Sequence, residues 1–392
     1  MKPNFRWPKE GLVFAHLIHP MNSAYDDFSK AFPWLKNIFS IFSSIYNCFL
    51  IKKFYKKVLK RELKKEPLEV FESWLKKNMQ KLPPFAFRCQ IKGSGKVVGW
   101  IIAVPVMARN LLNPSPKYKV PAMRKIVQAL KLARFLGAKI VSLGALTSVV
   151  SNGGNDLVGS VKGITVINGN WLTAYITKKL PLDVYEKIWG DGKPVVAVVG
   201  ATGSIGSAVS QMLADDGYDL ICIARDQSEL ANLQSSVSKR APGSSSKLTV
   251  SSDISRIKDA NLVIVATSST DAIIKPEHLG FGAVVYDITW PRNTSKSILT
   301  TRPDVVIVDG GVLFTPNIIY RFNLEPTPQY IHACISNAIL MAYEGRKEDQ
   351  VGKVDVDGAK REGRNFESHP ELIECAEFTS FGEKIKIGQA EA

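Results

Sequence analysis

The sequence predicts an α/β fold of the doubly wound, parallel-sheet class, and three observations carry this prediction. The 392-residue chain is 45% hydrophobic, which is enough to bury a sizeable core, and its length suggests two domains. Short runs such as LVIVATSS, AVVYDI and DVVIVDGG are apolar on both faces and alternate with helical patterns, as expected for strands in a parallel sheet. The third observation is a glycine-rich turn between a strand and a helix.

The glycine-rich turn lies within VVAVVGATGSIGSAVSQMLADDGYDLICIAR, residues 195–225. Three glycines follow an apolar run at GxxGxxG spacing, where a strand must turn into a helix. In dinucleotide-binding Rossmann folds they permit the tight turn, let a pyrophosphate approach the backbone and bring the helix close to the sheet, and the helix N-terminus faces the anion. A purely structural turn is the alternative. The pattern therefore predicts a Rossmann nucleotide-binding site containing Gly200, Thr202, Gly203, Ser204, Ile205 and Gly206.

The end of the second strand, predicted over 219–224, bears on which cofactor is bound. An NAD enzyme usually carries an acidic residue there and an NADP enzyme an arginine. This chain has Arg225 after Ala224, and a planar cation suits a 2'-phosphate. We interpret the following Asp226 as a helix cap, because Glu229 stands three residues later in a capping-box arrangement. NADPH is predicted, with NAD as the alternative.

The residues before the glycine-rich turn also have an α/β pattern. FAFRCQI and KVVGWIIAV predict strands, a helix begins near residues 107–112, and NPSPKYKVP reads as a linker. Apolar residues at helical spacing over 123–133 predict a helix ended by Gly137. The strand AKIVSLG enters a polar loop whose Thr147, Ser148 and Asn152 are candidate cleft residues or ordinary turn formers. ITVINGNWLTAYITKK repeats the strand-then-helix step.

Four regions follow from these patterns. We expect an N-terminal substrate domain over 1–187, a nucleotide-binding domain over 188–318, a helix over 319–348 that returns to the cleft, and a polar, partly irregular tail over 349–392. Within the nucleotide-binding domain, Ala266 and Thr267 follow a strand on the side where the nicotinamide half is expected.

The net charge of +15 favours an acidic partner. Charge alone fits an anionic membrane surface, an acidic carrier protein or nucleic acid, and of these we do not expect nucleic acid. Eight basic residues lie in 52–65, directly after an aromatic-rich run, so that 32–65 forms a basic and aromatic insertion. A helical hairpin on the protein and an interfacial membrane helix both fit it, and a true membrane span fits poorly because the apolar part is short and contains polar residues.

The cysteine pattern indicates a reducing compartment. The five cysteines are odd in number and show no CxxC spacing, which argues against a disulfide framework or a zinc site: Cys48, Cys89, Cys222, Cys334 and Cys375. The N-terminus lacks a signal-peptide pattern. We therefore expect a cytoplasmic protein without a metal, which 32–65 would allow to associate peripherally with a membrane.

Several stretches together resemble the long-chain acyl-[acyl-carrier-protein] reductases, within the wider group of predicted amino-acid dehydrogenases related to shikimate dehydrogenase. They are GKVVGWIIAVPVMARNLL, SLGALTSVV, INGNWLTAYI, VVAVVGATGSIGSAV, IARDQSELANLQ and HACISNAILMAYEG. The resemblance covers roughly residues 13–348 without the insertion, and it departs at Leu172, at Ser204 and in YDITWPRN. It implies that an acyl thioester from a carrier protein or coenzyme A passes to Cys334 and is reduced by NADPH to a fatty aldehyde, in lipid metabolism.

Cys334 fits this chemistry by its own position. A cysteine early in a helix is expected to have a lowered pKa, because the helix dipole and free amides favour the thiolate. The alternative is a packed, inert thiol. His332 is a weaker candidate for a base, since it projects from another side of the helix. Two other functions stay open: a shikimate- or amino-acid-type dehydrogenase, in which the resemblance implies a Lys and Asp pair, and a non-catalytic nucleotide-bound scaffold at a membrane.

Overall fold

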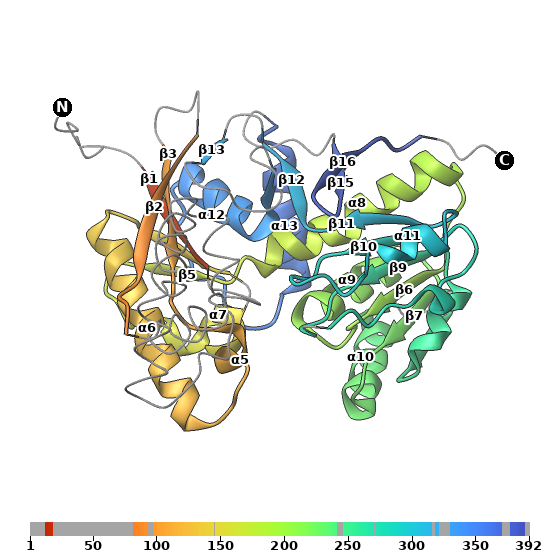
Figure 1. Cartoon of the computed structure of the whole chain (residues 1–392), viewed down its shortest axis with the longest axis horizontal. Coiled ribbons are helices and arrows are strands. Elements are labelled where there is room, and N and C mark those ends of the chain that lie inside the picture. The colour runs from red at the N-terminus through yellow and green to blue at the C-terminus, as the bar shows by residue number, and fades with distance from the viewer. Residues whose placement is uncertain are drawn as a thin grey trace, which may run out of the picture.

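The computed structural model describes residues 12–18, 81–91, 97–144, 146–240, 246–269, 271–315, 318–320, 330–370 and 377–388. The basic and aromatic insertion 32–65 lies outside these ranges. In the described part the strands form two large sheets that lie side by side, with two helices, α12 and α13, between them (Figure 1).

The second sheet along the chain has the strand order of a Rossmann fold. Its parallel strands follow the order β11-β10-β9-β6-β7-β8, so that the chain crosses from one half of the sheet to the other after β8. The strands are β6 (Val196–Val199), β7 (Leu220–Ile223), β8 (Leu248–Ser251), β9 (Leu262–Val265), β10 (Val284–Asp287) and β11 (Val306–Asp309). Apolar clusters cover both faces of this sheet. The predicted α/β fold with a doubly wound parallel sheet is confirmed.

Short helical segments connect the strands of this Rossmann sheet. They are α9 (Ser204–Asp215), α10 (Gln227–Arg240), the 3₁₀ turns η2 (Ile254–Asp259) and η3 (Pro276–His278), and α11 (Ser297–Thr301). The helix α9 is the one predicted after the glycine turn. Its buried residues, among them Val209, Met212 and Leu213, recur at helical spacing and pack on the apolar cluster of the sheet.

The N-terminal sheet has the order β13-β2-β3-β1-β4-β5. Strands β1, β3, β4 and β5 run parallel. At one edge β2 pairs antiparallel with β3, and β13 pairs antiparallel with β2. The strands are β1 (Leu12–Ile18), β2 (Phe85–Ile91), β3 (Val97–Ala103), β4 (Ile140–Leu143), β5 (Thr165–Ile167) and β13 (Ile318–Tyr320). One face packs on α6 (Pro116–Phe135) and the other on α12 (Ala333–Glu344). The carboxyl ends of β1, β4 and β5 therefore meet near one end of α12.

Two expected loops in this half are helical. The predicted linker NPSPKYKVP enters α6 at Pro116, which is tolerated because the first helical position needs no amide donor. The polar loop after β4 forms α7 (Leu146–Val150) and the 3₁₀ segment η1 (Asn152–Leu157). The short helix α5 (Ala108–Leu111) lies within the range where a helix was predicted.

One long helix joins the two sheets. The helix α8 (Asn170–Trp189) begins directly after β5 and packs against α9 and α12 and against strands of the Rossmann sheet. Its buried residues Leu172, Ile176 and Leu180 belong to the same apolar cluster as the Rossmann strands. Because one rigid helix belongs to both halves, it sets their relative position.

Within the described ranges, the polar tail after residue 348 contains a helix and a hairpin that the sequence patterns did not indicate. It forms α13 (Val356–Glu367), which packs on α8, and a hairpin of β15 (Phe378–Ser380) and β16 (Glu383–Ile385) against β11. The carboxylate of Asp355 accepts a hydrogen bond from the Gly358 amide and caps α13. A further strand pair, β12 (Val312–Phe314) with β14 (Tyr330–His332), leads into α12.

A search of the described ranges finds no helix long and apolar enough to cross a membrane. The same ranges contain no group of three or more His, Cys, Asp or Glu side chains that is able to hold a metal ion.

Candidate functional site

The glycine turn after β6 is shaped by close backbone contacts. Gly200 has a φ of +85°, and a Cβ there would lie 2.5 Å from the carbonyl oxygen of Ala266. A Cβ on Gly206 would lie 2.2 Å from the carbonyl oxygen of Gly200. Both positions therefore require glycine, as the GxxGxxG spacing predicts.

The N-terminus of α9 is open to an anion. Its N-cap is Gly203, which is exposed, and no side chain of the described residues caps the first turn. The adjoining Thr202, Ser204 and Ile205 are partly buried. The first amides of a helix carry partial positive charge and no intrahelical partner, so this turn fits a pyrophosphate. The Ser204 hydroxyl accepts a hydrogen bond from the Val354 amide at 3.0 Å, which ties the turn to the chain before α13.

A cation and a carboxylate that is already hydrogen-bonded to backbone amides follow the carboxyl end of β7. Arg225 is exposed directly after Ala224. Asp226 Oδ1 accepts hydrogen bonds from the amides of Ser228 at 2.9 Å and Glu229 at 3.1 Å. These bonds, with one from the Ser228 hydroxyl, hold the pKa of Asp226 below its usual value. Asp226 is therefore a helix cap, as predicted, and Arg225 is exposed where it can face a ligand at this edge.

The end of β9 closes the same edge. The Ala266 amide donates to the carbonyl oxygen of Val199 at 2.8 Å, beside the glycine turn. The Thr267 hydroxyl donates to Oδ1 of the buried Asn293 at 2.5 Å. The structure thus brings the predicted cofactor residues together along the carboxyl ends of β6, β7 and β9.

Cys334 lies at a second junction, on the N-terminal sheet. It is the second residue of α12, which confirms its predicted place in the first turn of a helix. Gly169, the N-cap of α8, has a φ of +70°, and a Cβ there would lie 2.4 Å from Cβ of Cys334. The Ser142 hydroxyl on β4 donates to the Cys334 carbonyl oxygen at 3.0 Å. The thiol is therefore placed where β4, α8 and α12 meet.

The expected lowering of the Cys334 pKa was wrong. Its side chain keeps some exposed surface, yet burial raises the thiol pKa to about 12, while the backbone amides of Ile335 and Cys334 only partly offset this. A charged thiolate loses more by leaving water than it gains from a helix N-terminus at this position.

A buried histidine beside this junction was missed by the sequence reasoning. His16 on β1 is the register partner of Ser142 and is 3% exposed. Its ring fits because Gly144 lacks a Cβ, which would lie 2.7 Å from Nε2 of His16. Burial, with a smaller contribution from His332, lowers the pKa of His16 to about 3. The available signal was a polar residue inside the apolar strand LVFAHLI, next to a strand that ends in glycine.

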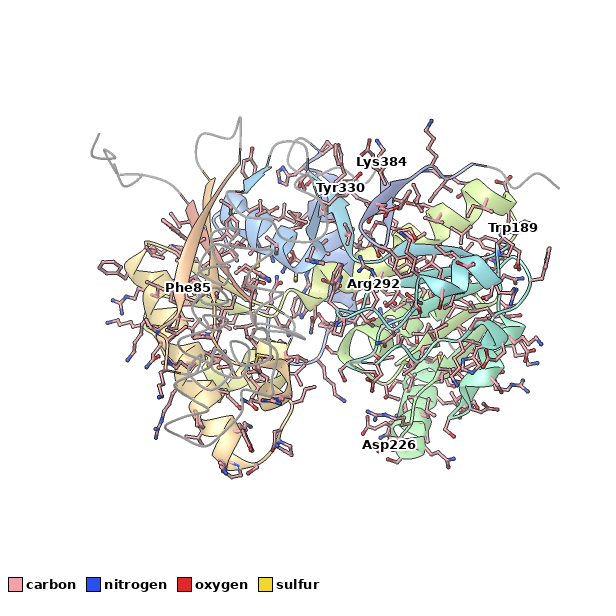
Figure 2. All side chains as sticks on the ribbon, in the orientation of Figure 1. Phe85, Trp189, Asp226, Arg292, Tyr330 and Lys384 are labelled. Atoms are coloured by element: carbon pink, nitrogen blue, oxygen red, sulfur yellow. The ribbon has the colours of Figure 1, made fainter. Side chains whose placement is uncertain are left out.

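The Rossmann half reaches the Cys334 junction through the loop after β10. The ring of Trp290 meets that of His332 edge to face at 4.9 Å. The Arg292 guanidinium lies 4.3 Å from the centre of the Trp290 ring, and its Nε donates to Asp309 Oδ1 at 2.6 Å. In Figure 2 Arg292 lies toward the middle of the molecule, whereas Asp226 lies at the far end of the Rossmann half. The same loop carries Asn293, which binds Thr267, so it contacts both the cofactor edge of the Rossmann sheet and the Cys334 junction.

Asp309 is held from the other side by the C-terminal hairpin. Its Oδ2 accepts hydrogen bonds from the Thr379 hydroxyl at 3.0 Å and the Gly382 amide at 2.7 Å. The ring of Phe381 lies 5.5 Å from the guanidinium of Arg292. The supposed tail thus helps to position Arg292.

The candidate cleft residues after β4 have mainly structural contacts. The buried Thr147 donates its hydroxyl to the carbonyl oxygen of Gly144 at 2.7 Å, and Ser148 is buried as well. Asn152 is exposed and has a φ of 54°. His332, the N-cap of α12, lies against Trp290.

Comparison with known proteins identifies related sequences. Residues 186–309 match the family model described as shikimate / quinate 5-dehydrogenase. The chain is 28% identical over 246 residues to the long-chain acyl-[acyl-carrier-protein] reductase of Synechococcus elongatus, covering 57% of this chain and 67% of that protein. It is 29% identical over 261 residues to the aminotransferase PigE of Serratia sp., covering 64% of this chain but spanning only 29% of PigE.

Two solved structures are similar over most of the chain. One is quinate dehydrogenase from Corynebacterium glutamicum in complex with NAD. The match covers 92% of this chain and 99% of the dehydrogenase, at 12% identity and a TM-score of 0.37. The other is L-tryptophan dehydrogenase from Nostoc punctiforme. The match covers 91% of this chain and 80% of the tryptophan dehydrogenase, at 11% identity and a TM-score of 0.37. The sequence matches support an NAD(P)-dependent oxidoreductase whose residues 186–309 are similar to the shikimate / quinate dehydrogenases.

Proposed function

We propose that this protein reduces long-chain acyl thioesters to fatty aldehydes with NADPH, through an acyl intermediate on Cys334. The observation that carries the proposal is the position of Cys334, in the first turn of α12 at the carboxyl ends of the N-terminal strands and within reach of the Rossmann loop through His332 and Trp290. The similarity to the Synechococcus reductase supports the same reaction.

The first step is a thiol exchange at Cys334. The sulfur adds to the carbonyl carbon of the substrate thioester, and collapse of the resulting oxyanion expels the carrier thiolate, which takes up the proton that the Cys334 thiol loses. Ser142 and Gly169 fix the start of α12 during this step, because one binds the Cys334 carbonyl and the other packs on its Cβ. The raised thiol pKa means that little thiolate is present before the substrate arrives.

The proposed cofactor contacts come from three segments at one edge of the Rossmann sheet. The open turn at Gly203 to Gly206 would hold the pyrophosphate, Arg225 the 2'-phosphate of NADPH, and Ala266 with Thr267 the nicotinamide half. When bound, the nicotinamide supplies the hydride that, with a proton, releases the acyl group as aldehyde and restores the thiol.

The domain roles belong to the same proposal. Residues 1–187 would bind the substrate, 188–318 would bind the cofactor, and 319–348 would carry Cys334 into the cleft. The net charge of +15 suits an acidic acyl carrier protein, and a cytoplasmic enzyme with an insertion at 32–65 suits release of a lipid product at an anionic membrane surface.

The decisive experiment is NADPH oxidation by the purified protein with acyl-carrier-protein and long-chain acyl-CoA substrates, followed by mass spectrometry of the products. We expect aldehyde in a one-to-one ratio with oxidised NADPH. NADPH binding without turnover on either thioester would contradict the proposal and would favour the non-catalytic scaffold.

The match over 186–309 favours a second candidate, a shikimate- or quinate-type dehydrogenase. That chemistry needs an acid–base pair in the substrate half rather than a nucleophile. At the ends of β1, β4 and β5, residues 16–18, 142–144 and 167–169 contain neither Lys nor Asp. Reduction of NADP⁺ or NAD⁺ by shikimate or quinate, retained when Cys334 is replaced by serine, would favour this candidate.

A further inference from the structure

His16 is a buried polar side chain that the proposed reaction has not yet used. It is 3% exposed, and within the described part of the chain its Nδ1 has no hydrogen-bond partner. An unpaired buried donor or acceptor destabilises the fold, and native structures contain few of them.

The surrounding residues place the imidazole beside the reactive junction. His16 and Ser142 are register partners on adjacent parallel strands, so their side chains project from the same face of the sheet. The Ser142 side chain on that face binds the carbonyl oxygen of Cys334. The other end of the ring lies over Gly144, and His332, two residues before Cys334, lies close enough to lower the pKa of His16.

The environment decides the protonation state of the ring. Burial and the nearby His332 lower the pKa of His16 and disfavour the imidazolium, so the ring is neutral at physiological pH. A neutral imidazole is a poor acceptor for the proton of a thiol with a raised pKa, but it still has one N–H to donate. Such a donor stabilises a developing oxyanion without giving up its proton.

We propose that His16 is a catalytic residue whose neutral imidazole donates a hydrogen bond to the carbonyl oxygen of the substrate thioester. The bond strengthens when the Cys334 sulfur adds to the carbonyl carbon and the π electrons move onto that oxygen. It weakens again when the oxyanion collapses and the carrier thiolate leaves with the thiol proton. The proposal rests on the acyl-thioester function above.

Two reactions of Cys334 separate this role from its alternatives. Acylation by palmitoyl-CoA without NADPH forms an oxyanion, whereas alkylation by iodoacetamide does not, and mass spectrometry follows both at the Cys334 peptide. His16→Phe keeps the size of the ring without a donor, and His16→Gln keeps an amide N–H. Ser142→Ala is the matched control, because it disturbs the start of α12 and should affect both reactions alike.

We expect His16→Phe to slow acylation by roughly 10²- to 10³-fold, the usual effect of removing one oxyanion donor, while alkylation changes by less than about threefold. His16→Gln should recover part of the acylation rate, and it also serves as the test if the phenylalanine variant does not fold. Equal losses in both reactions, or unchanged acylation, would overturn the role of His16. A wild-type protein that is alkylated but never acylated would instead reject the acyl-thioester function on which the role depends.

Discussion

Two helix N-termini in this protein follow the carboxyl ends of strands, and their environments differ. The start of α9 is open: its N-cap Gly203 is exposed and no side chain in the described ranges caps it. The start of α12 is enclosed by β4, by the N-cap of α8 and by the loop carrying Trp290. The first offers free amides to an anion, whereas the second holds Cys334 in surroundings that raise its pKa.

The difference shows that a helix N-terminus does not by itself determine what lies there. The amides of the first turn contribute at most about 2 kcal/mol in favourable geometry. Desolvation of a buried ionisable group shifts its pKa by up to about 3–5 units, at about 1.4 kcal/mol per unit, and therefore outweighs the dipole when a side chain is enclosed. The open turn suits a ligand group that is always charged, such as a pyrophosphate. The enclosed turn suits a thiol that ionises only during the reaction.

The largest expected effect comes from removing the thiol at the enclosed start of α12. Cys334→Ser should lower aldehyde formation by at least about 10³-fold, because an unassisted serine hydroxyl is a poor nucleophile, while NADPH affinity stays within about twofold. Product mass spectrometry and fluorescence titration of NADPH measure the two quantities. Cys222→Ala, which removes a buried thiol that contacts Ser210 of α9, is the control and should retain the adduct at Cys334. An active serine variant would remove the thiol from the mechanism.

The second prediction tests the raised thiol pKa directly. The rate of iodoacetamide alkylation at Cys334 should rise about tenfold between about pH 9 and pH 10, because the thiolate fraction is still increasing in that range. A thiol with the usual pKa of about 8.5 would be nearly saturated there. Quantification of the modified Cys334 peptide gives the rate, and a plateau above about pH 9 would show that the helix N-terminus outweighs burial after all.

The third prediction concerns the open site. Arg225→Ala should raise the Kd for NADPH by roughly 10- to 150-fold and the Kd for NADH by less than about threefold, since it removes a charge-assisted contact worth about 1.5–3 kcal/mol. Isothermal titration measures both constants. The exposed Arg256, which pairs with Asp259, provides a matched control variant. If both affinities weaken equally, Arg225 does not read the 2'-phosphate.

Per pH unit, the smallest effect is on stability, and it concerns His16. Its pKa is about 3 in the folded state against an ordinary value of 6.5, so the unfolded chain binds a proton first as the pH falls. The free energy of unfolding should therefore drop by about 1.4 kcal/mol per pH unit between pH 6.5 and pH 3 from this residue. Chemical denaturation of wild type and His16→Phe at about pH 7.5, 5.5 and 4.5 should show wild type losing stability relative to the variant. If the difference in stability between wild type and variant does not change with pH, the pKa of His16 is the same in the folded and unfolded states.

The sequence was informative where a site is local along the chain. The glycines of the turn lie within seven consecutive residues, 200–206, and the first and last are required by backbone contacts that the spacing already implies. The Cys334 junction is different, because His16, Ser142 and Gly169 reach it from three distant segments. Cys334 was found through a family resemblance, and the burial that raises its pKa depends on neighbours that no local pattern reveals.

The helix α13 shows why a helix was overlooked in the tail. Its segment contains Gly358 and Gly363, which disfavour a helix in isolation. A Cβ at Gly358 would lie 2.5 Å from the ring of Trp171, and one at Gly363 would lie 2.3 Å from that of Tyr175. The glycines therefore let α13 approach α8 closely, and tertiary packing compensates for their low helix propensity.

The hydrogen bonds of Asp309 also bear on how the chain folds during synthesis. This carboxylate belongs to β11, whereas Thr379, one of its donors, is added 70 residues later. At about 5–20 residues per second, translation leaves a delay of roughly 4–14 s before the hairpin is made. During that interval β11 lacks the cover of β15, so this edge of the Rossmann sheet is open to other chains and to chaperones until the hairpin emerges.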